Sequence, residues 1–133
     1  MYIKAGFSFF RQIYTLAHEA SERVRESCAA PSELRDGADY SLSYPDHLSG
    51  YCVDGGELRA VFSLVPGRGT ILVKDAVFRG AERLDCFDGY LVQLYRRLGF
   101  TETARATNWT PGQPDVVYMA LAHAEPDYAA GHV

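Results

Sequence analysis

The sequence predicts an α/β domain in which helices flank a central mixed sheet, and three observations support this prediction. Residues 57–100 read as strand, glycine-containing turn, helix, strand, turn and helix in succession. A strand, a helix and a strand in that order favour a parallel strand pair joined by a crossover helix. The 133 residues suffice for one core, and a hydrophobic content of 47% with a charged content of 23% is ordinary for a soluble globular protein.

The N-terminal part is predicted to hold one short strand and one long helix. Residues 2–5 form the strand, and Ser8 is placed to cap a helix over residues 9–27. Apolar side chains recur at helical spacing along this helix, so they are expected to share its buried face. They are Phe9, Ile13, Leu16, Ala20 and Val24. The helix is expected to end before Pro31, because the residue that precedes a proline avoids the α region.

Two predicted strands then lead into the centre of the domain. They cover residues 40–44 and 50–54, and residues 54–56, Asp-Gly-Gly, are a hairpin turn into a third strand over residues 57–65. Apolar groups lie on both faces of the third strand toward its end, as expected of a strand covered on both sides. The third strand is therefore the predicted centre of the sheet.

A glycine-containing turn follows the central strand. Residues 66–70, PGRGT, break the strand because proline removes a backbone donor and the glycines permit a tight bend. Thr70 is placed to cap a helix over residues 71–79, which Gly80 ends. The amide groups at the start of this helix, the helix dipole and the charge of Arg68 together offer a site for an anion. The turn lacks the lysine and hydroxyl pair of a P-loop and the full glycine spacing of a dinucleotide site.

The strand and helix pattern then recurs. Residues 84–87 are a strand, Asp88 and Gly89 a turn, and residues 90–98 a helix that Gly99 ends. The predicted buried face of this helix consists of Leu91, Leu94, Tyr95 and Leu98. Strands over residues 100–106 and 116–121 complete a single domain of residues 1–122, and residues 123–133 are predicted to be a loosely ordered tail.

Composition narrows the classes of function. The net charge of −4 argues against broad binding to nucleic acid, which requires a basic face. The three cysteines have no metal-ligand spacing, so no metal site is predicted, and a reducing, cytoplasmic location is the simplest interpretation. No apolar run approaches the ~20 residues of a membrane span, and no signal peptide is recognisable.

The run LYRRLGF, residues 94–100, resembles the end of the acyl-CoA-binding core of the GNAT N-acetyltransferase superfamily. In that family a helix with Leu-Tyr, closed by Gly-Phe, follows the strand beside the cofactor. The turn at residues 66–70 also lies where the family has its pyrophosphate-binding turn, and the resemblance covers residues 51–121. It implies a GNAT-like fold and the transfer of an acyl group, with acetyl-CoA as donor, to an amine of a small molecule or protein.

The resemblance also implies the roles of individual residues. Tyr95 would protonate the departing thiolate of coenzyme A. The cofactor-binding residues would be Val61, Phe62 and Ser63 along the strand, Gly67, Arg68, Gly69 and Thr70 in the turn, and Asp88, which stands where the family often has asparagine. The attacking amine must lose a proton, and the candidates for the general base are Glu57 and Asp85, with Asp54 on the same hairpin as Glu57.

Each of these roles has a structural alternative. Tyr95 also fits a core aromatic, Arg68 a solvated charge and Asp88 a turn residue or helix cap; Glu57 and Asp85 also fit surface carboxylates. A second class of function also stays open, a GNAT-like protein without transferase activity that binds a protein partner. The shortened turn and the charge of Asp88 favour that class. A nucleic-acid-modifying enzyme is disfavoured by the acidic balance, and a homodimer stays open.

Overall fold

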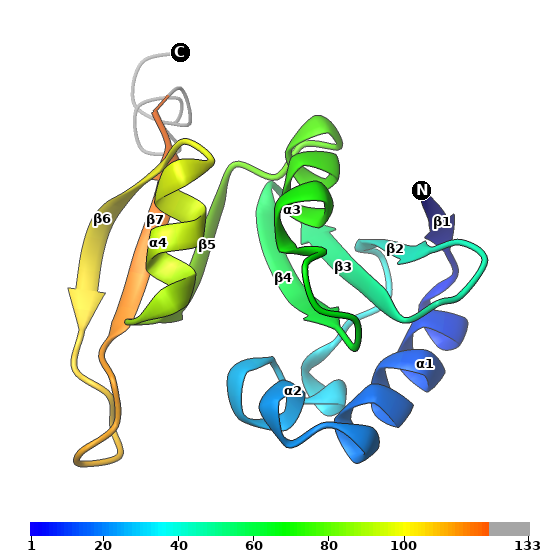
Figure 1. Cartoon of the computed structure of the whole chain (residues 1–133), viewed down its shortest axis with the longest axis horizontal. Helices are drawn as coiled ribbons and strands as arrows, with labels where there is room; N and C mark the ends of the chain where they lie inside the picture. The colour runs from blue at the N-terminus through cyan, green and yellow to red at the C-terminus, as the bar shows by residue number, and fades with distance from the viewer. Residues whose placement is uncertain (123–133) are drawn as a thin grey trace. The chain divides into compact units, whose positions relative to one another are not determined.

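The structure is a computed structural model that describes residues 1–122 (Figure 1). The chain divides into two compact units, Met1–Ala81 and a second one that starts at Glu82. Both units combine helices with strands, which confirms the predicted α/β class. The tail predicted for residues 123–133 lies outside the described residues.

The first unit contains four strands in the order β1-β2-β3-β4. Their bounds are Tyr2–Ala5, Asp39–Ser43, Ser49–Asp54 and Glu57–Ser63, and all neighbours are antiparallel. The predicted hairpin between β3 and β4 is confirmed, because Asp54 pairs with Glu57 across a two-residue turn. Both turn residues, Gly55 and Gly56, have positive φ angles of 59° and 88°, which glycine adopts without steric cost.

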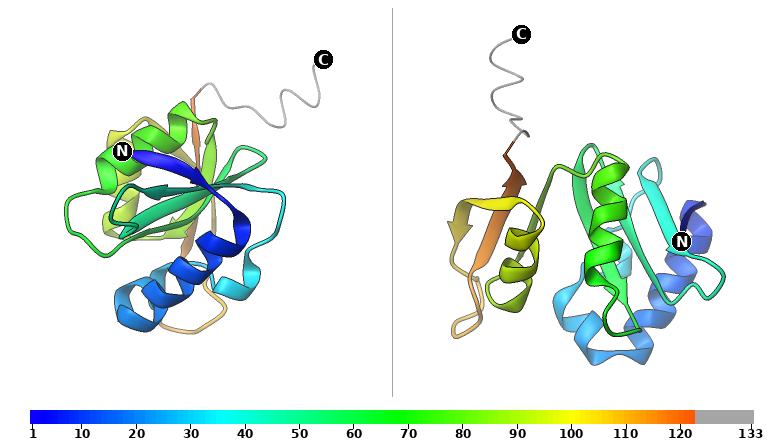
Figure 2. Two further views of the ribbon diagram at one scale, coloured as in Figure 1. Left: turned by 90° about the vertical axis from the view of Figure 1, so that its right-hand side faces the viewer. Right: turned by 45° about the horizontal axis from the view of Figure 1, so that its top comes forward.

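Helices cover both faces of this sheet (Figure 2). The helices α1 (Phe7–Ala20) and α2 (Glu22–Ser27), with a short 3-10 turn η1 (Pro31–Glu33), lie on one face. The core on that side is formed by Phe10, Tyr14, Ala17, Val24, Tyr40, Leu42, Cys52, Ala60 and Phe62. The helix α3 (Gly69–Phe78) lies on the other face, where it buries Leu72, Val73 and Ala76.

The predicted long helix over residues 9–27 is wrong in two respects. It is two helices that meet at Ser21, whose backbone is extended and whose Oγ accepts a hydrogen bond of 3.2 Å from the Val24 amide. The buried face of α1 is also shifted by one residue, since the large rings of Phe10 and Tyr14 occupy the core, whereas Val24 of the predicted stripe is buried as expected. Phe9 and Leu16 of the predicted stripe are exposed, because the spacing of apolar residues fits either side of α1 equally well.

The two helix caps predicted from side chains in this unit are also wrong. Gly6, not Ser8, precedes the first residue of α1, and its extended backbone leads the chain into the helix. In α3 the helix begins at Gly69, so Thr70 lies inside its first turn and Arg68 holds the cap position. No side chain caps either N-terminus. Gly80 does follow α3 with a positive φ of 106°, as predicted.

His18 is a buried imidazole at the end of α1. Its side chain is 8% exposed, and its Nε2 has no hydrogen-bond partner within residues 1–122. Burial lowers the pKa of His18 below its ordinary value, because the charged ring would lose its hydration. The unfolded chain then binds more protons than the folded one as the pH falls below about 6.5.

We therefore expect the contribution of His18 to the free energy of unfolding to be fully present above about pH 6.5. This contribution should be lost as the pH falls from there through the lowered pKa of His18. The His18→Leu variant should lack this part of the pH dependence. Urea unfolding of both proteins at several values between pH 8 and pH 5 measures the difference. If the free energy of unfolding varied with pH in the same way in both proteins, the pKa of His18 would not differ between the folded and unfolded states.

The second unit contains three strands in the order β5-β7-β6, with antiparallel neighbours. Their bounds are Arg83–Phe87 for β5, Phe100–Ala106 for β6 and Val116–Leu121 for β7, and the helix α4 spans Tyr90–Arg97. The positive φ of 102° at Gly99 confirms its predicted place after the helix. The buried residues of α4 are Val92, Leu94 and Tyr95, whereas Leu91 and Leu98 are only partly buried.

Candidate functional site

The turn between β4 and α3 is shaped by backbone bonds and one glycine. The Leu64 amide donates to the Leu48 carbonyl at 2.8 Å, which continues the pairing with β3. The hydroxyl of Ser63 accepts from the Val65 amide at 3.1 Å and donates to the Val65 carbonyl at 2.6 Å. Gly67 then adopts a φ of 83°, a conformation that favours glycine. The chain is thereby turned from the strand into the start of α3.

The N-terminus of α3 presents backbone donors. The first intrahelical bond runs from the Leu72 amide to the Arg68 carbonyl at 2.9 Å, so the amides of Gly69, Thr70 and Ile71 precede the helical ladder. No side chain caps this end, and its first turn holds no acidic residue. Thr70 is exposed, as is the Ile71 side chain, at 65%. These amides and the helix dipole form an accessible positive end that suits a phosphate group.

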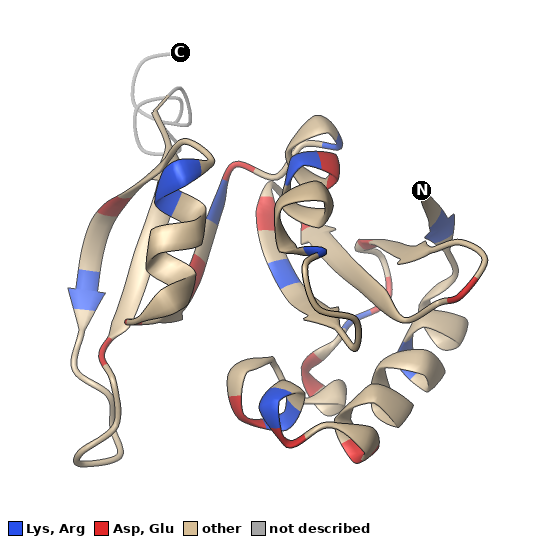
Figure 3. Ribbon diagram, viewed as in Figure 1, with Lys and Arg blue, Asp and Glu red and all other residues tan. Residues whose placement is uncertain are grey.

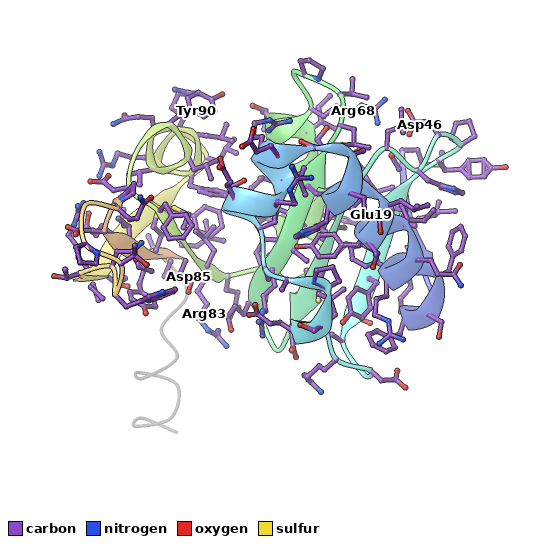
Figure 4. The ribbon with its side chains drawn as sticks, turned by 90° about the horizontal axis from the view of Figure 1, so that it is seen from below. Glu19, Asp46, Arg68, Arg83, Asp85 and Tyr90 are labelled. Atoms are coloured by element: carbon purple, nitrogen blue, oxygen red, sulfur yellow. The ribbon has the colours of Figure 1, made fainter. Side chains whose placement is uncertain are left out.

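Arg68 is held by the protein itself, which sequence reasoning missed. Its Nη2 donates to Asp46 Oδ2 at 2.6 Å, and its Nη1 donates to the hydroxyls of Ser43 and Ser49 at 3.3 and 3.1 Å. Figure 4 shows Arg68 and Asp46 side by side at the edge of the unit. The pKa of Asp46 is held far below its usual range, chiefly by the bonds from Arg68. The guanidinium therefore joins the turn to the loop between β2 and β3.

A bulge lies in β4 next to the residues predicted to bind the pantetheine arm. Gly50 pairs with Phe62 but Cys52 pairs with Arg59, so β4 contains one extra residue there. Ala60 has a φ of 53°, which is uncommon for a residue with a side chain. Bulges bend a strand and redirect its backbone groups, often beside functional sites. The regular alternation of side chains in this stretch gave no sign of the bulge.

Two backbone carbonyl groups of β4 accept hydrogen bonds from side chains of α2 and of the residue that directly follows it. The Val61 carbonyl accepts from Cys28 Sγ at 2.9 Å, and the Ser63 carbonyl accepts from Arg23 Nη2 at 2.8 Å. The Leu64 amide bonds to Leu48, directly before β3, so by the alternation of a strand Val61 and Ser63 direct their backbone groups away from β3. An extended ligand on this edge would consequently bond mainly to strand N–H donors.

The predicted general bases have different surroundings. Glu57 starts β4, at the opposite end of that strand from the glycine turn, and is half-buried. Its cross-strand neighbour Asp54 is bound by both donors of the Arg35 fork, which lowers the pKa of Asp54. Asp85 is exposed on β5 opposite Tyr118. Glu57 lies in the first unit with the turn, and Asp85 lies in the second unit with Tyr95.

Tyr95 and Asp88 belong to the second unit. The Tyr95 ring is 5% exposed and meets the Phe100 ring edge-on, with 5.8 Å between centroids. Asp88 lies in the turn before α4, one of its two structural alternatives, and Gly89 rather than Asp88 holds the cap position. Its carboxylate instead accepts from Arg105 Nη1 at 2.7 Å, and this bond lowers the pKa of Asp88. The charge of Asp88 is thereby compensated within the unit.

The surroundings of the three cysteines disfavour the nucleophilic thiolate form, because burial raises the pKa of each thiol. All three thiols are free, and burial raises the pKa of Cys52 and of Cys86 to about 11. At neutral pH almost no thiolate is present at either residue.

No group of side chains within residues 1–122 is placed to hold a metal ion, and no helix in that range is long and apolar enough to cross a membrane. Acidic and basic residues are interspersed along the ribbon (Figure 3).

Comparison with known proteins identifies the fold. No protein-family model and no curated protein matches the chain. Solved structures match almost all of it. An acyl-CoA N-acyltransferase from Pseudomonas aeruginosa is 13% identical, with 92% of this chain and 99% of that chain covered and a TM-score of 0.65.

Two further solved structures agree with this match. YjaB from Escherichia coli in its apo form is 18% identical, with 93% of this chain and 98% of that chain covered and a TM-score of 0.58. The ribosomal-protein-alanine N-acetyltransferase from Brucella melitensis is 17% identical, with 90% and 97% covered and a TM-score of 0.53. The chain has the GNAT fold, as the run at residues 94–100 predicts.

Proposed function

We propose that the chain is an acyl-CoA-dependent N-acyltransferase that uses acetyl-CoA and transfers its acetyl group to an amine of a small molecule or protein. The observation that carries this proposal is the uncapped N-terminus of α3, directly after the glycine turn. The amides of Gly69, Thr70 and Ile71 would bond to the diphosphate of coenzyme A. The GNAT fold supports the assignment, because solved proteins of this fold include an acyl-CoA N-acyltransferase.

The backbone of β4 would hold the pantetheine arm. Val61, Phe62 and Ser63 directly precede the turn, so a ligand with its diphosphate at α3 would extend along them. The carbonyls of Val61 and Ser63 accept bonds from Cys28 and Arg23, so we expect their N–H groups to bond to the pantetheine carbonyls. The arm then leads toward the end of β4 that carries Glu57.

The chemistry requires one proton acceptor and one proton donor. Acyl-CoA supplies an activated acyl group, and the amine nitrogen forms a bond to its carbonyl carbon while the carbon–sulfur bond breaks. Glu57 or Asp85 takes the proton that the amine loses, and the Tyr95 hydroxyl gives a proton to the departing sulfur. The raised pKa values of Cys52 and Cys86 favour direct transfer over an acyl-cysteine route. Three free thiols suit a reducing, cytoplasmic location.

Incubation with acetyl-CoA and a set of amine acceptors tests this function. The set should include polyamines, amino acids and peptides with free N-termini. We expect free coenzyme A to accumulate only with a suitable acceptor, and mass spectrometry should show that acceptor with one added acetyl group. Failure to bind coenzyme A at all would overturn the enzymatic assignment and favour a protein that works by binding a partner.

A further inference from the structure

Arg68 is the centre of a hydrogen-bond network that connects the glycine turn to the loop between β2 and β3. Its fork reaches both carboxylate oxygens of Asp46, since Nη1 also lies 3.2 Å from Oδ1. The same Oδ1 accepts from the Ser43 hydroxyl at 2.7 Å and from the Leu48 amide at 3.0 Å. Asp46 thus receives bonds from the turn and from its own loop at the same time.

The other side of the network is buried. Ser43 and Ser49 are 5% and 0% exposed, and both hydroxyls lie within hydrogen-bond distance of Arg68 Nη1. The Ser49 hydroxyl also bonds to the Tyr2 hydroxyl at 2.9 Å, and the Ser49 amide bonds to the Ser43 hydroxyl at 3.1 Å. If the guanidinium turned outward to a ligand, these buried hydroxyls would lose a donor and the Asp46 charge would lose its partner. Such losses disfavour the outward orientation.

The position of Arg68 in the chain makes this network relevant to the anion site. Arg68 is the cap residue of α3, and its carbonyl accepts the first helical bond, from Leu72. A side chain that is fixed at this residue also fixes the backbone immediately before the amides of Gly69, Thr70 and Ile71. Preorganised donors bind a charged group more tightly than donors that must first be ordered.

We propose that Asp46 and Arg68 are positioning residues that clamp the turn, so that the amides of α3 are held in the arrangement that binds the coenzyme A diphosphate. This inference rests on the proposed function for its ligand. It assigns Arg68 a different role from direct contact with the pyrophosphate, the role that the family resemblance implies. The two roles differ in what they predict for Asp46.

The Asp46→Asn variant separates the two roles. It keeps the shape of the side chain but removes the charge that holds Arg68. A clamp that is loosened should weaken acetyl-CoA binding about tenfold, with a matching rise in KM and a kcat within about twofold of the wild type. An Arg68 that contacts phosphate directly would be freed by this change, so tighter binding would overturn the clamp. Titration calorimetry on protein verified to be folded measures the affinity.

The Arg35→Gln variant is the matched control. It removes the other two-pronged arginine–aspartate pair of the first unit, Arg35 with Asp54, which lies at the β3–β4 hairpin. We expect this control to leave the affinity for acetyl-CoA unchanged. An equal loss of affinity in both variants would show a general structural effect and would overturn the clamp.

Hydrogen exchange of the free protein tests the clamp without any ligand. Peptides that cover residues 64–72 should exchange faster in Asp46→Asn than in the wild type, and those in Arg35→Gln should not. Unchanged exchange in that segment would overturn the clamp. If the wild type fails to bind acetyl-CoA while the exchange still rises in Asp46→Asn, the proposed function falls and the clamp stands.

Discussion

Gly50→Ala should destabilise the protein by about 3 kcal/mol, a large share of the total stability of a small domain. A Cβ atom at this position would lie 2.5 Å from the Ser41 carbonyl oxygen, 2.8 Å from Leu42 Cδ2 and 3.0 Å from Phe62 Cε1. The first contact is with the backbone of a neighbouring strand, so a side-chain rotation cannot relieve it. The strand β3 would have to move away from β2 or β4, and urea unfolding measures the cost.

Gly6→Ala provides the control for this prediction. A Cβ at Gly6 meets no atom within 4 Å, and this residue precedes α1 in an extended conformation. We expect its effect on stability to stay within about 1 kcal/mol. If Gly50→Ala unfolds at the same urea concentration as Gly6→Ala, that result would contradict the close packing of β2, β3 and β4 around position 50.

Tyr95→Phe should lower kcat about a hundredfold while the affinity for acetyl-CoA changes by less than about twofold. The substitution removes the hydroxyl and keeps the ring that packs edge-on against Phe100. A proton donor to the departing thiolate acts mainly in the transition state, so its loss affects turnover more than binding. Steady-state kinetics with acetyl-CoA and the identified acceptor, together with titration calorimetry, separate the two effects.

Tyr90→Phe is the control on the same helix. Tyr90 starts α4 and is 71% exposed, so removal of its hydroxyl should leave kcat and stability close to those of the wild type. A Tyr95→Phe enzyme with normal kcat would show that Tyr95 is only a core aromatic. That outcome would leave the proposed function in place but without its proton donor.

The local parts of the fold could be predicted from the sequence. Glycines at positions that require a positive φ mark the β3–β4 hairpin and the end of α4, and the structure confirms both. The strands β6 and β7 also match their predicted bounds, since β6 follows Gly99 and the loop between the two strands contains two prolines and a glycine. Such features depend on a few neighbouring residues, and the sequence displays those directly.

Features that depend on tertiary contacts could not be predicted in this way. The sequence predicts that the Phe9 side of α1 is buried, whereas Phe10 and Tyr14 occupy the core, and only packing against the sheet decides between the two sides. The pair between Asp46 and Arg68 joins residues 22 positions apart, and neither residue has a motif that connects it to the other. The bulge at Ala60 likewise depends on pairing with β3 and not on local sequence.

The central claim is that the uncapped N-terminus of α3 binds the diphosphate of acetyl-CoA, and the Thr70→Asp variant tests it most directly. An acidic side chain in the first turn interacts favourably with the helix dipole, so the free protein should gain about 0.3–1 kcal/mol of stability. The same charge would repel a diphosphate, so the affinity for acetyl-CoA should fall at least about tenfold. Thr70→Asn adds no charge, so its gain in stability and its loss of affinity for acetyl-CoA should both be smaller than those of Thr70→Asp.

Calorimetric titration of acetyl-CoA into the wild type and these two variants is the decisive measurement. We predict binding by the wild type and by Thr70→Asn, and a strong loss of binding by Thr70→Asp despite its higher stability. Wild-type protein that binds acetyl-CoA no more tightly than Thr70→Asp does would contradict the claim that this helix end holds the ligand.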